Sequence, residues 1–253
     1  MKKGKKLYEG KAKIIFASTD KNLVIQHFKD EATAFNNQKK ANIEGKGILN
    51  NRISEHILSA LKDVGIENHL VKRLNMREQL IDLVDIVPVE FVIRNIVTGS
   101  LTKRLGIEEG TILNKPLIEF CYKNDTLGDP LVAREHIYAF EWASVMELEY
   151  ITEQCLRIND FLLGMFKGIG IKLVDFKLEF GKRKSDGKII LADEISPDTC
   201  RLWDADTEKK LDKDRFRKDL GDVVEAYQEV ARRLGILHEQ ASNVRPIKFP
   251  KPT

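Results

Sequence analysis

Apolar and charged residues alternate along residues 173–181 of the chain. Asp175, Lys177 and Glu179 are separated there by phenylalanine and leucine. Because side chains two positions apart on a strand point the same way, the pattern predicts a strand with three charges on one face and apolar groups on the other. Three formal charges in a row, flanked by so much apolar surface, indicate a polar site built on a buried sheet.

A second strand follows after a turn at residues 186–187, an Asp-Gly pair that permits two registers. A two-residue loop would pair Glu179 with Glu194, whereas a three-residue loop would pair it with Asp193. In either register two carboxylates oppose each other beside a lysine. Facing carboxylates repel unless a cation lies between them, and Mg²⁺ that bridges nucleotide phosphates is the usual occupant. The alternative is a solvent-facing hairpin with assorted charges.

Hydrophobic spacing predicts the remaining elements. Apolar residues three and four apart indicate helices, and Ser144 and Glu147 have the spacing of a capping box. Because strands come before a mixture of helices and strands, we expect an α+β fold with a smaller lobe over residues 1–85 and a larger lobe over residues 86–253. The predicted strands cover residues 7–17, 23–28, 66–74 and 85–96, and the predicted helices cover residues 53–64, 100–106, 144–168 and 214–234.

Composition narrows the possible functions. The 253 residues contain 42 Lys and Arg against 39 Asp and Glu, a balance that does not favour a nucleic-acid binder but leaves room for a local basic pocket. Cys121, Cys155 and Cys200 are odd in number and widely spaced, so neither a disulfide framework nor a zinc site is indicated, and a reducing cytoplasm is the expected compartment. No apolar run reaches about 18 residues, so no membrane helix is expected.

Two segments outside the hairpin carry groups that suit anionic ligands. Gly10 permits close approach of a ligand to a strand, and Lys11 and Lys13, expected on one face of that strand, suit a polyphosphate. The alternative is a solvated edge strand. The loop at residues 123–129 holds two acids and a lysine, and by itself it is a turn-rich connection.

The other segment that suits an anionic ligand is the apolar strand that carries Glu90 and Arg94. These two residues share strand parity, and a buried charge needs a partner or a ligand. Ser100 then opens a helix, whose free N–H groups suit a phosphate. The alternative is an ion pair between Glu90 and Arg94, with Ser100 as a helix cap.

Together these segments resemble the SAICAR synthetase family, the phosphoribosylaminoimidazole-succinocarboxamide synthases of purine biosynthesis. The matches run in order from residue 7 to about residue 235, and their order and spacing are more specific than any single motif. They lie at residues 10–13, 87–100, 103–110, 123–125, 173–181, 193–198, 201–203 and 214–217.

The resemblance implies an ATP-dependent ligase with Mg²⁺. Its members join 5-amino-1-(5-phosphoribosyl)imidazole-4-carboxylate (CAIR) to L-aspartate and release ADP and phosphate, through an expected acyl phosphate. The implied fold has a smaller antiparallel lobe and a larger mixed α/β lobe with ATP between them, and a homodimer is expected. Two alternatives are a small-molecule kinase with the same ATP cleft and a nucleotide-binding module without catalysis.

The resemblance also implies roles for particular residues. Lys177, Asp193 and Arg201 are the expected catalytic residues, and Asp129, Glu179 and Asp193 are the expected metal-side acids. The expected nucleotide contacts are Lys11, Lys13, Lys123, Glu179 and Asp193. The expected contacts to the imidazole substrate are Arg94, Ser100, Asp175, Lys177, Arg201, Arg215 and Arg217.

One segment departs from the family pattern. Many members carry Asp-Gly after an Ala-Phe pair, whereas Asn36 and Asn37 stand at those positions here. Asparagine keeps an oxygen acceptor but loses a charge, so we assign no metal ligand there. Glu44, in the same loop, is only a candidate.

Overall fold

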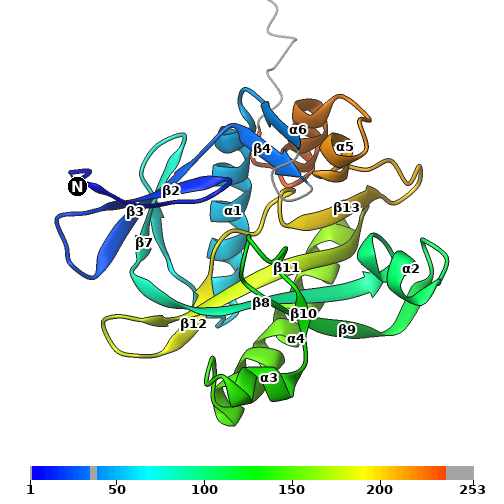
Figure 1. The fold of residues 1–253 in the computed structure, drawn as a ribbon. Helices are drawn as coiled ribbons and strands as arrows, with labels where there is room; N and C mark the ends of the chain where they lie inside the picture. The colour runs from blue at the N-terminus through cyan, green and yellow to red at the C-terminus, as the bar shows by residue number, and fades with distance from the viewer. Residues whose placement is uncertain (1, 35–38, 238–253) are drawn as a thin grey trace, which may run out of the picture.

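Two antiparallel sheets form the frame of the protein. The computed structural model describes residues 2–34 and 39–237 (Figure 1). The first sheet has five strands in the order β1-β2-β3-β7-β6 and lies in the blue to cyan part of the chain. These strands are β1 (Lys6–Glu9), β2 (Lys13–Ala17), β3 (Leu23–Phe28), β6 (Leu70–Arg73) and β7 (Glu78–Asp82).

The second sheet follows directly in the chain. It has six strands, in the order β10-β9-β8-β11-β12, with β13 also paired to β11. They are β8 (Val84–Ile96), β9 (Ile112–Tyr122), β10 (Leu131–Val132), β11 (Ile171–Arg183), β12 (Ile189–Ala192) and β13 (Cys200–Asp204).

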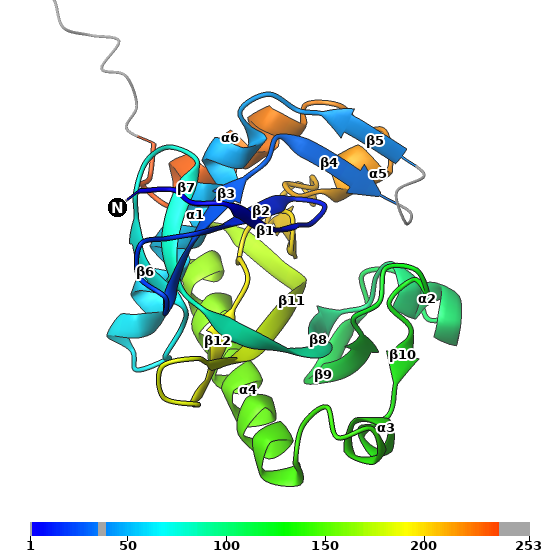
Figure 2. The ribbon, with the colours of Figure 1, turned by 60° about the vertical axis from the view of Figure 1, so that its left-hand side comes forward.

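A small third sheet pairs β4 (Glu31–Ala34) with β5 (Lys39–Asn42). It lies beside the short helix α5 (Asp214–Arg217), where Ala32 and Ala34 pack on Phe216 (Figure 2). The predicted α+β class is therefore confirmed by antiparallel sheets combined with helices.

Helices supply much of the core. Besides α5, the helices of the described residues are α1 (Lys46–Asp63), α2 (Ser100–Leu105), α3 (Arg134–Ala139), α4 (Val145–Gly168) and α6 (Val223–Arg233). Apolar side chains of α1, α4, α6 and the second sheet join one continuous core cluster. The predicted capping box at Ser144 and Glu147 is confirmed, since each residue's side chain accepts a hydrogen bond from the other's backbone N–H.

The central strand β11 confirms the alternation seen in the sequence. Phe176, Leu178 and Phe180 are each 1% exposed, and the ring of Phe180 meets Phe91 edge to face at 5.5 Å. On the other face, Asp175 lies opposite residues of both β8 and β13. The charged row is therefore held between neighbouring strands and is not on a solvated edge.

Both registers predicted for the hairpin are wrong. Glu179 lies opposite Ala192, so neither Asp193 nor Glu194 is its partner on β12. The carboxylate that faces Glu179 belongs to Glu90 of β8. Two opposed acids are present as expected, but the second comes from a different strand.

The physical reason lies in the turn, which has four residues, 184–187. The backbone N–H of Arg183 donates to Lys188, and Gly187 adopts the left-handed conformation with φ 74°. The guanidinium of Arg183 also holds Asp186 at 2.6 Å. The turn is therefore longer than the two- and three-residue loops on which the predicted registers rested.

Two further predictions of continuous elements are wrong. Residues 7–17 form a hairpin of two strands, since the backbone N–H of Gly10 donates to Lys13 at 2.9 Å. Lys11 lies in that turn, so Lys11 and Lys13 do not share a strand face. The turn replaces the uninterrupted strand because a glycine and two polar residues separate the apolar runs.

The helix predicted over residues 214–234 is broken. Helix α5 ends at Arg217 and α6 begins at Val223, and the link includes Asp219, Gly221 and Asp222 with φ of 53°, 68° and 47°. Positive φ angles end a right-handed helix. The apolar spacing persists across the break, which explains why periodicity alone joined the two segments.

The two tryptophans of the chain lie in different surroundings. Trp142 stacks on Tyr122 at 4.4 Å and on Phe140 at 5.3 Å between ring centroids. Trp203, on β13, is 3% exposed, and the Lys210 ammonium lies over its ring. Tyr122 and Trp203 belong to two different strands, β9 and β13, of the second sheet.

Candidate active site

A cavity of about 500 Å³ is lined by residues of both sheets. Apolar side chains of the first sheet line it, among them Ile15, Val24 and Ile81. The residues predicted to bind nucleotide or metal also line it, together with Lys177. They are Lys11, Lys13, Lys123, Asp129, Glu179 and Asp193.

Lys177 lies at the centre of the charged groups in this cavity. Its ammonium lies 2.5 Å from Glu179, 3.0 Å from Glu90 and 3.4 Å from Asp193. Burial opposes the charged form, but Glu179 and Glu90 outweigh it and hold the pKa of Lys177 above its ordinary value. The opposed carboxylates of Glu90 and Glu179 are stable side by side because this lysine lies between them.

Glu179 is also held by Lys123, whose ammonium lies 2.8 Å away. Burial would raise the pKa of Glu179, but Lys177 and Lys123 outweigh it and hold the pKa well below its usual range. Lys123 begins the predicted loop, in which Asp125 pairs with Lys11 at 2.7 Å. The loop therefore brings its charges to the cavity, which its composition alone did not indicate.

Asp193 follows the end of β12 with φ 60°. Its carboxylate contacts Lys13 and Lys177, and Glu194 also contacts Lys13 at 3.1 Å. Burial lowers the pKa of Lys13, although Glu194 and Glu179 act in the opposite direction. Asp193 and Glu194, the alternative partners of Glu179 in the two predicted registers, thus both lie at the site. We call Lys13, Lys123, Lys177, Glu179 and Asp193 the lysine cluster.

A second group of charges lies farther along the same face of β11. Asp175 lies between Arg94 of β8 at 2.7 Å and Arg201 of β13 at 2.8 Å. Arg201 and Arg217 both bind Asp214, at 3.0 and 2.6 Å. We call Arg94, Ser100, Asp175, Arg201, Asp214 and Arg217 the arginine cluster.

Arg94 has an acceptor for each of its three nitrogens. Its Nε donates to Glu119 at 2.7 Å, one terminal nitrogen donates to Asp175, and the other donates to Ser100 at 3.0 Å. The alternative ion pair between Arg94 and Glu90 is therefore wrong. Ser100 is no helix cap either, because Gly99 holds that position without a side-chain bond.

Gly99 fits this arrangement because its backbone and its neighbour both exclude a side chain. Its φ is 60°, and a Cβ atom would lie 2.8 Å from a terminal nitrogen of Arg201. The structure does not bring Arg215 to the same place. Its guanidinium donates to the carbonyls of Leu220 and Gly221, in the break before α6.

Several buried polar groups near the cavity were missed by sequence reasoning. Lys46, 1% exposed, lies 2.6 Å from Asp198, which also accepts a hydrogen bond from Tyr227 at 2.6 Å. His69 lines the cavity, and its Nε2 has no hydrogen-bond partner. Burial lowers the pKa of His69 to about 3. Asp198 is the last residue of the family motif at residues 193–198. It was the one signal in the sequence for the network of Lys46, Asp198 and Tyr227.

The loop that departs from the family pattern gives no further site residue. Asn36 and Asn37 lie outside the residues that the structure describes, and Glu44 is exposed. In the described ranges 2–34 and 39–237, no three acids, histidines or cysteines form a metal site by themselves.

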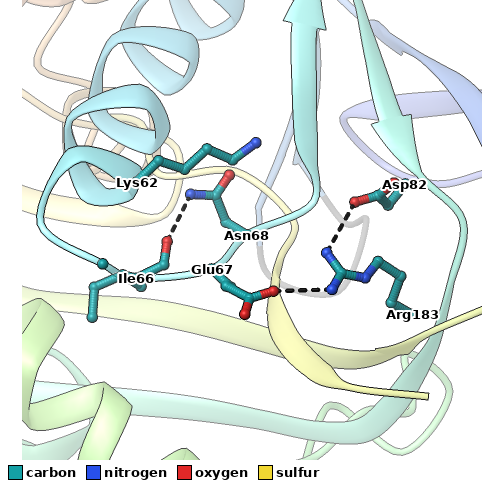
Figure 3. A pocket seen from close by; sticks show the side chains of 7 residues that line it. Lys62, Ile66, Glu67, Asn68, Asp82 and Arg183 are labelled. Carbon is teal, nitrogen blue, oxygen red and sulfur yellow. Dashed lines mark hydrogen bonds and ion pairs between the residues drawn. The ribbon is translucent and has the colours of Figure 1, made fainter. Parts of the chain in front are cut away.

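A separate cavity of about 390 Å³ lies near the end of α1 (Figure 3). Arg183 crosses it and contacts Glu67 at 3.0 Å and Asp82 at 3.7 Å. Asn68 donates to the carbonyl of Ile66. The polar groups that line this cavity are thus largely paired with one another, and none of the predicted site residues lines it.

Comparison with known proteins gives one consistent result. A family profile for SAICAR synthetase matches residues 6–234. A phosphoribosylaminoimidazole-succinocarboxamide synthase from Pelagibacter ubique is 71% identical over 253 residues, which cover 99% of this chain and 97% of the relative.

Solved structures agree. The crystal structure of the synthase from Ehrlichia chaffeensis has a TM-score of 0.91 at 54% identity and covers 93% of this chain and 100% of that one. A SAICAR synthetase in complex with ADP has a TM-score of 0.87 at 46% identity and covers 90% and 96% of the two chains.

Fold, site and similarity together define an ATP-dependent ligase of purine biosynthesis. The chain belongs to the SAICAR synthetase family. Among the described residues, no helix has the length and apolar character that crossing a bilayer requires.

Proposed function

We propose that the chain joins CAIR to L-aspartate with ATP bound in the cavity between the sheets and CAIR at the arginine cluster. The observation that carries this arrangement is the row of charges on β11. Asp175 and Lys177 share one strand face, so the two clusters adjoin where a phosphoryl donor and its acceptor must meet. The relative solved with ADP supports a nucleotide on the lysine side.

The chemistry follows from the poor reactivity of a carboxylate as an acyl donor. A carboxylate oxygen of CAIR attacks the γ-phosphorus of ATP, and ADP leaves with the electrons of the broken P–O bond. The aspartate amine then attacks the acyl carbon, loses a proton, and phosphate departs. Lys177 offsets the negative charge at the meeting point of these groups, and we assign Asp193 and Arg201 to holding the two reactants on either side.

On the nucleotide side, Lys11, Lys13 and Lys123 are proposed to bind the phosphates of ATP. Each is a mobile point charge already placed at the cavity. All three pair with carboxylates in the structure, and phosphate oxygens can replace those partners. Glu179 and Asp193 are then released from Lys123 and Lys13, respectively, to serve the metal or the ribose.

Mg²⁺ fits the carboxylates present. Glu179 and Asp193 both contact the ammonium of Lys177, so their oxygens converge within reach of one cation, and oxygen donors suit Mg²⁺. Glu179 and Asp193 would hold the ion together with the nucleotide phosphates. When bound, the ion offsets phosphate charge. Asp129, which lines the same cavity, is proposed as a further acid on the metal side.

On the imidazole side, the arginine cluster is proposed to hold the phosphoribosyl group. The planar fork of Arg94 matches phosphate geometry, and Ser100 and Arg201 lie beside it. Arg217 reaches the same cluster through Asp214. Asp175 is proposed to orient both guanidinium groups and to accept from a ribose hydroxyl.

The larger organisation is part of the same proposal. The first sheet ends with β7 and the second begins with β8 at Val84, which supports lobes over residues 1–85 and 86–253. We further propose a homodimer in the cytoplasm, where the free thiols of Cys121, Cys155 and Cys200 remain reduced. Sedimentation of the purified chain tests the dimer.

The central experiment measures ADP release with ATP, Mg²⁺ and CAIR, with and without L-aspartate. We expect continuous turnover only when all three substrates are present. Stoichiometric phosphorylation of an acceptor without any need for aspartate would identify a kinase instead. Nucleotide binding without turnover at saturating substrates would identify a binding module.

A further inference from the structure

Lys213 is an unpaired lysine at the cavity. It lies just before α5, lines the cavity and is partly buried. The other lysines that line the cavity each have a carboxylate within ion-pair distance. Among the described residues, the side chain of Lys213 forms no hydrogen bond or ion pair, although burial lowers its pKa against the attraction of Asp198.

The acids near Lys213 already have other partners. One oxygen of Asp198 binds Lys46 and the other accepts from Tyr227, both at 2.6 Å. Asp214 binds Arg201 and Arg217. Asp212 accepts backbone N–H groups at 2.7 and 2.8 Å. Glu194, the other described acid that acts on Lys213, contacts Lys13 at 3.1 Å. Each of these carboxylates, among the residues that the structure describes, thus already has another partner.

A cation withdrawn from water without a partner is unfavourable, and an anion from outside the chain relieves that cost. Lys213 lines the same cavity as Lys177. The backbone N–H of Lys177 donates to Thr199, which also lines the cavity. An anion bound at Lys213 thus lies in the space where the substrates meet.

The identity of the anion rests on the proposed function. Phosphates of ATP and CAIR are assigned to the lysine and arginine clusters, which leaves the CAIR carboxylate and the two carboxylates of L-aspartate. The CAIR carboxylate must attack phosphorus, and an ammonium held on it would withdraw negative charge from the attacking oxygen. The carboxylates of L-aspartate stay charged throughout. We propose that Lys213 binds a carboxylate of L-aspartate.

The test compares Lys213→Met with a matched control, Lys209→Met. Lys209 is exposed and close in sequence, and it has no proposed role. In Lys213→Met we expect the KM for L-aspartate to rise about 10- to 100-fold, the factor for losing one hydrogen bond between charged groups. The KM values for ATP and CAIR should stay within about twofold of the wild type, and Lys209→Met should match the wild type.

Succinate provides a second readout, because it keeps both carboxylates and lacks the amine. Its inhibition, competitive with L-aspartate, should weaken in Lys213→Met by the same factor as the KM rises, and Lys213→Arg should retain most of it. If the Met variant does not fold, Lys213→Gln replaces it. An unchanged KM for L-aspartate, a rise for CAIR instead, or a loss of kcat alone would each overturn the assignment.

These outcomes are separate from failure of the proposed function. Wild-type ADP release that does not depend on L-aspartate would remove the ligase arrangement itself. Full aspartate-dependent turnover with unchanged KM values in Lys213→Met would overturn only the role of Lys213.

Discussion

The lysine cluster and the arginine cluster hold similar charges on the same strand, but they are built differently. Lys177 shares one ammonium among Glu90, Glu179 and Asp193. Arg94, in contrast, gives each nitrogen its own acceptor and is 5% exposed. An ammonium can exchange partners by rotation of its stem, whereas a guanidinium fork is fixed in its plane.

This difference suits two kinds of ligand. In the arrangement proposed above, the nucleotide changes charge during the reaction, so its site would exchange lysine–carboxylate contacts for phosphate and metal contacts. A phosphoribosyl group only has to be held, and a fork already fixed by Glu119, Asp175 and Ser100 loses little freedom on binding. We therefore read the lysine cluster as the adaptable half of the site and the arginine cluster as its prearranged half.

The largest effect should come from Lys177→Ala. This change removes the cation between three acids at the reaction centre, so we expect kcat to fall about 1,000-fold and the KM for CAIR to change more than the KM for ATP. Lys172→Ala, on the same strand but paired at the surface with Glu208, is the matched control. Steady-state rates with each substrate varied test this, and a near-normal kcat would mean that the site is misplaced.

Arg94→Lys tests the prearranged half. A lysine cannot serve Glu119, Asp175 and Ser100 together, so the KM for CAIR should rise about 100-fold, as for the loss of two charged hydrogen bonds. The KM for ATP should hardly change. Arg157→Lys, on the exposed side of α4, is the control. Equal losses for CAIR and ATP would remove the distinction between the two clusters.

Asp193→Ala probes the adaptable half from the acid side. The loss of one metal-side carboxylate should raise the KM for Mg-ATP about 30-fold, with a smaller change for CAIR. Asp206→Ala, at an exposed position, controls for the loss of an acid. Titration with Mg²⁺ at fixed ATP gives a second measurement, since the variant should need more metal for half-maximal rate.

We expect the smallest effect from His69→Gln. The substitution should change the free energy of unfolding only at acidic pH. The folded pKa of His69 is about 3, below the unfolded value of about 6.5. The unfolded state therefore binds a proton first, and the folded state loses stability as pH falls below about 6.5. At pH 5.5 this loss is about 1.4 kcal/mol, and His69→Gln should lack it. Urea unfolding of both proteins at pH 7.5 and 5.5 measures the difference, and parallel losses would contradict it.

Sequence patterns predicted the parts of the site that depend on strand parity. Alternation along β11 placed Asp175, Lys177 and Glu179 on one face, and the buried underside confirmed it. Parity related Arg94 to Glu90 on β8, but the partners of Arg94 are Glu119, Asp175 and Ser100, which lie on other elements. These relations are local, because a strand fixes the direction of every second side chain.

Contacts between different segments of the chain were harder to predict from the sequence. The hairpin register depended on a four-residue turn closed by the bond from the backbone N–H of Arg183 to Lys188, whereas the rules for Asp-Gly turns predict shorter loops. The break between α5 and α6 depends on three residues with positive φ inside an otherwise helical spacing. The pairing of Lys46 with Asp198 joins residues far apart in the chain, and only the fold brings them together.

The positions of the two tryptophans allow ligand binding to be followed by intrinsic fluorescence. Trp142 stacks on Tyr122, the residue next to Lys123 of the adaptable half, and Trp203 lies two residues beyond Arg201 of the prearranged half. Replacing either one with phenylalanine leaves a single tryptophan, near one half of the proposed site. Fluorescence titrations of the two variants can thus follow the filling of each half separately, without any attached dye.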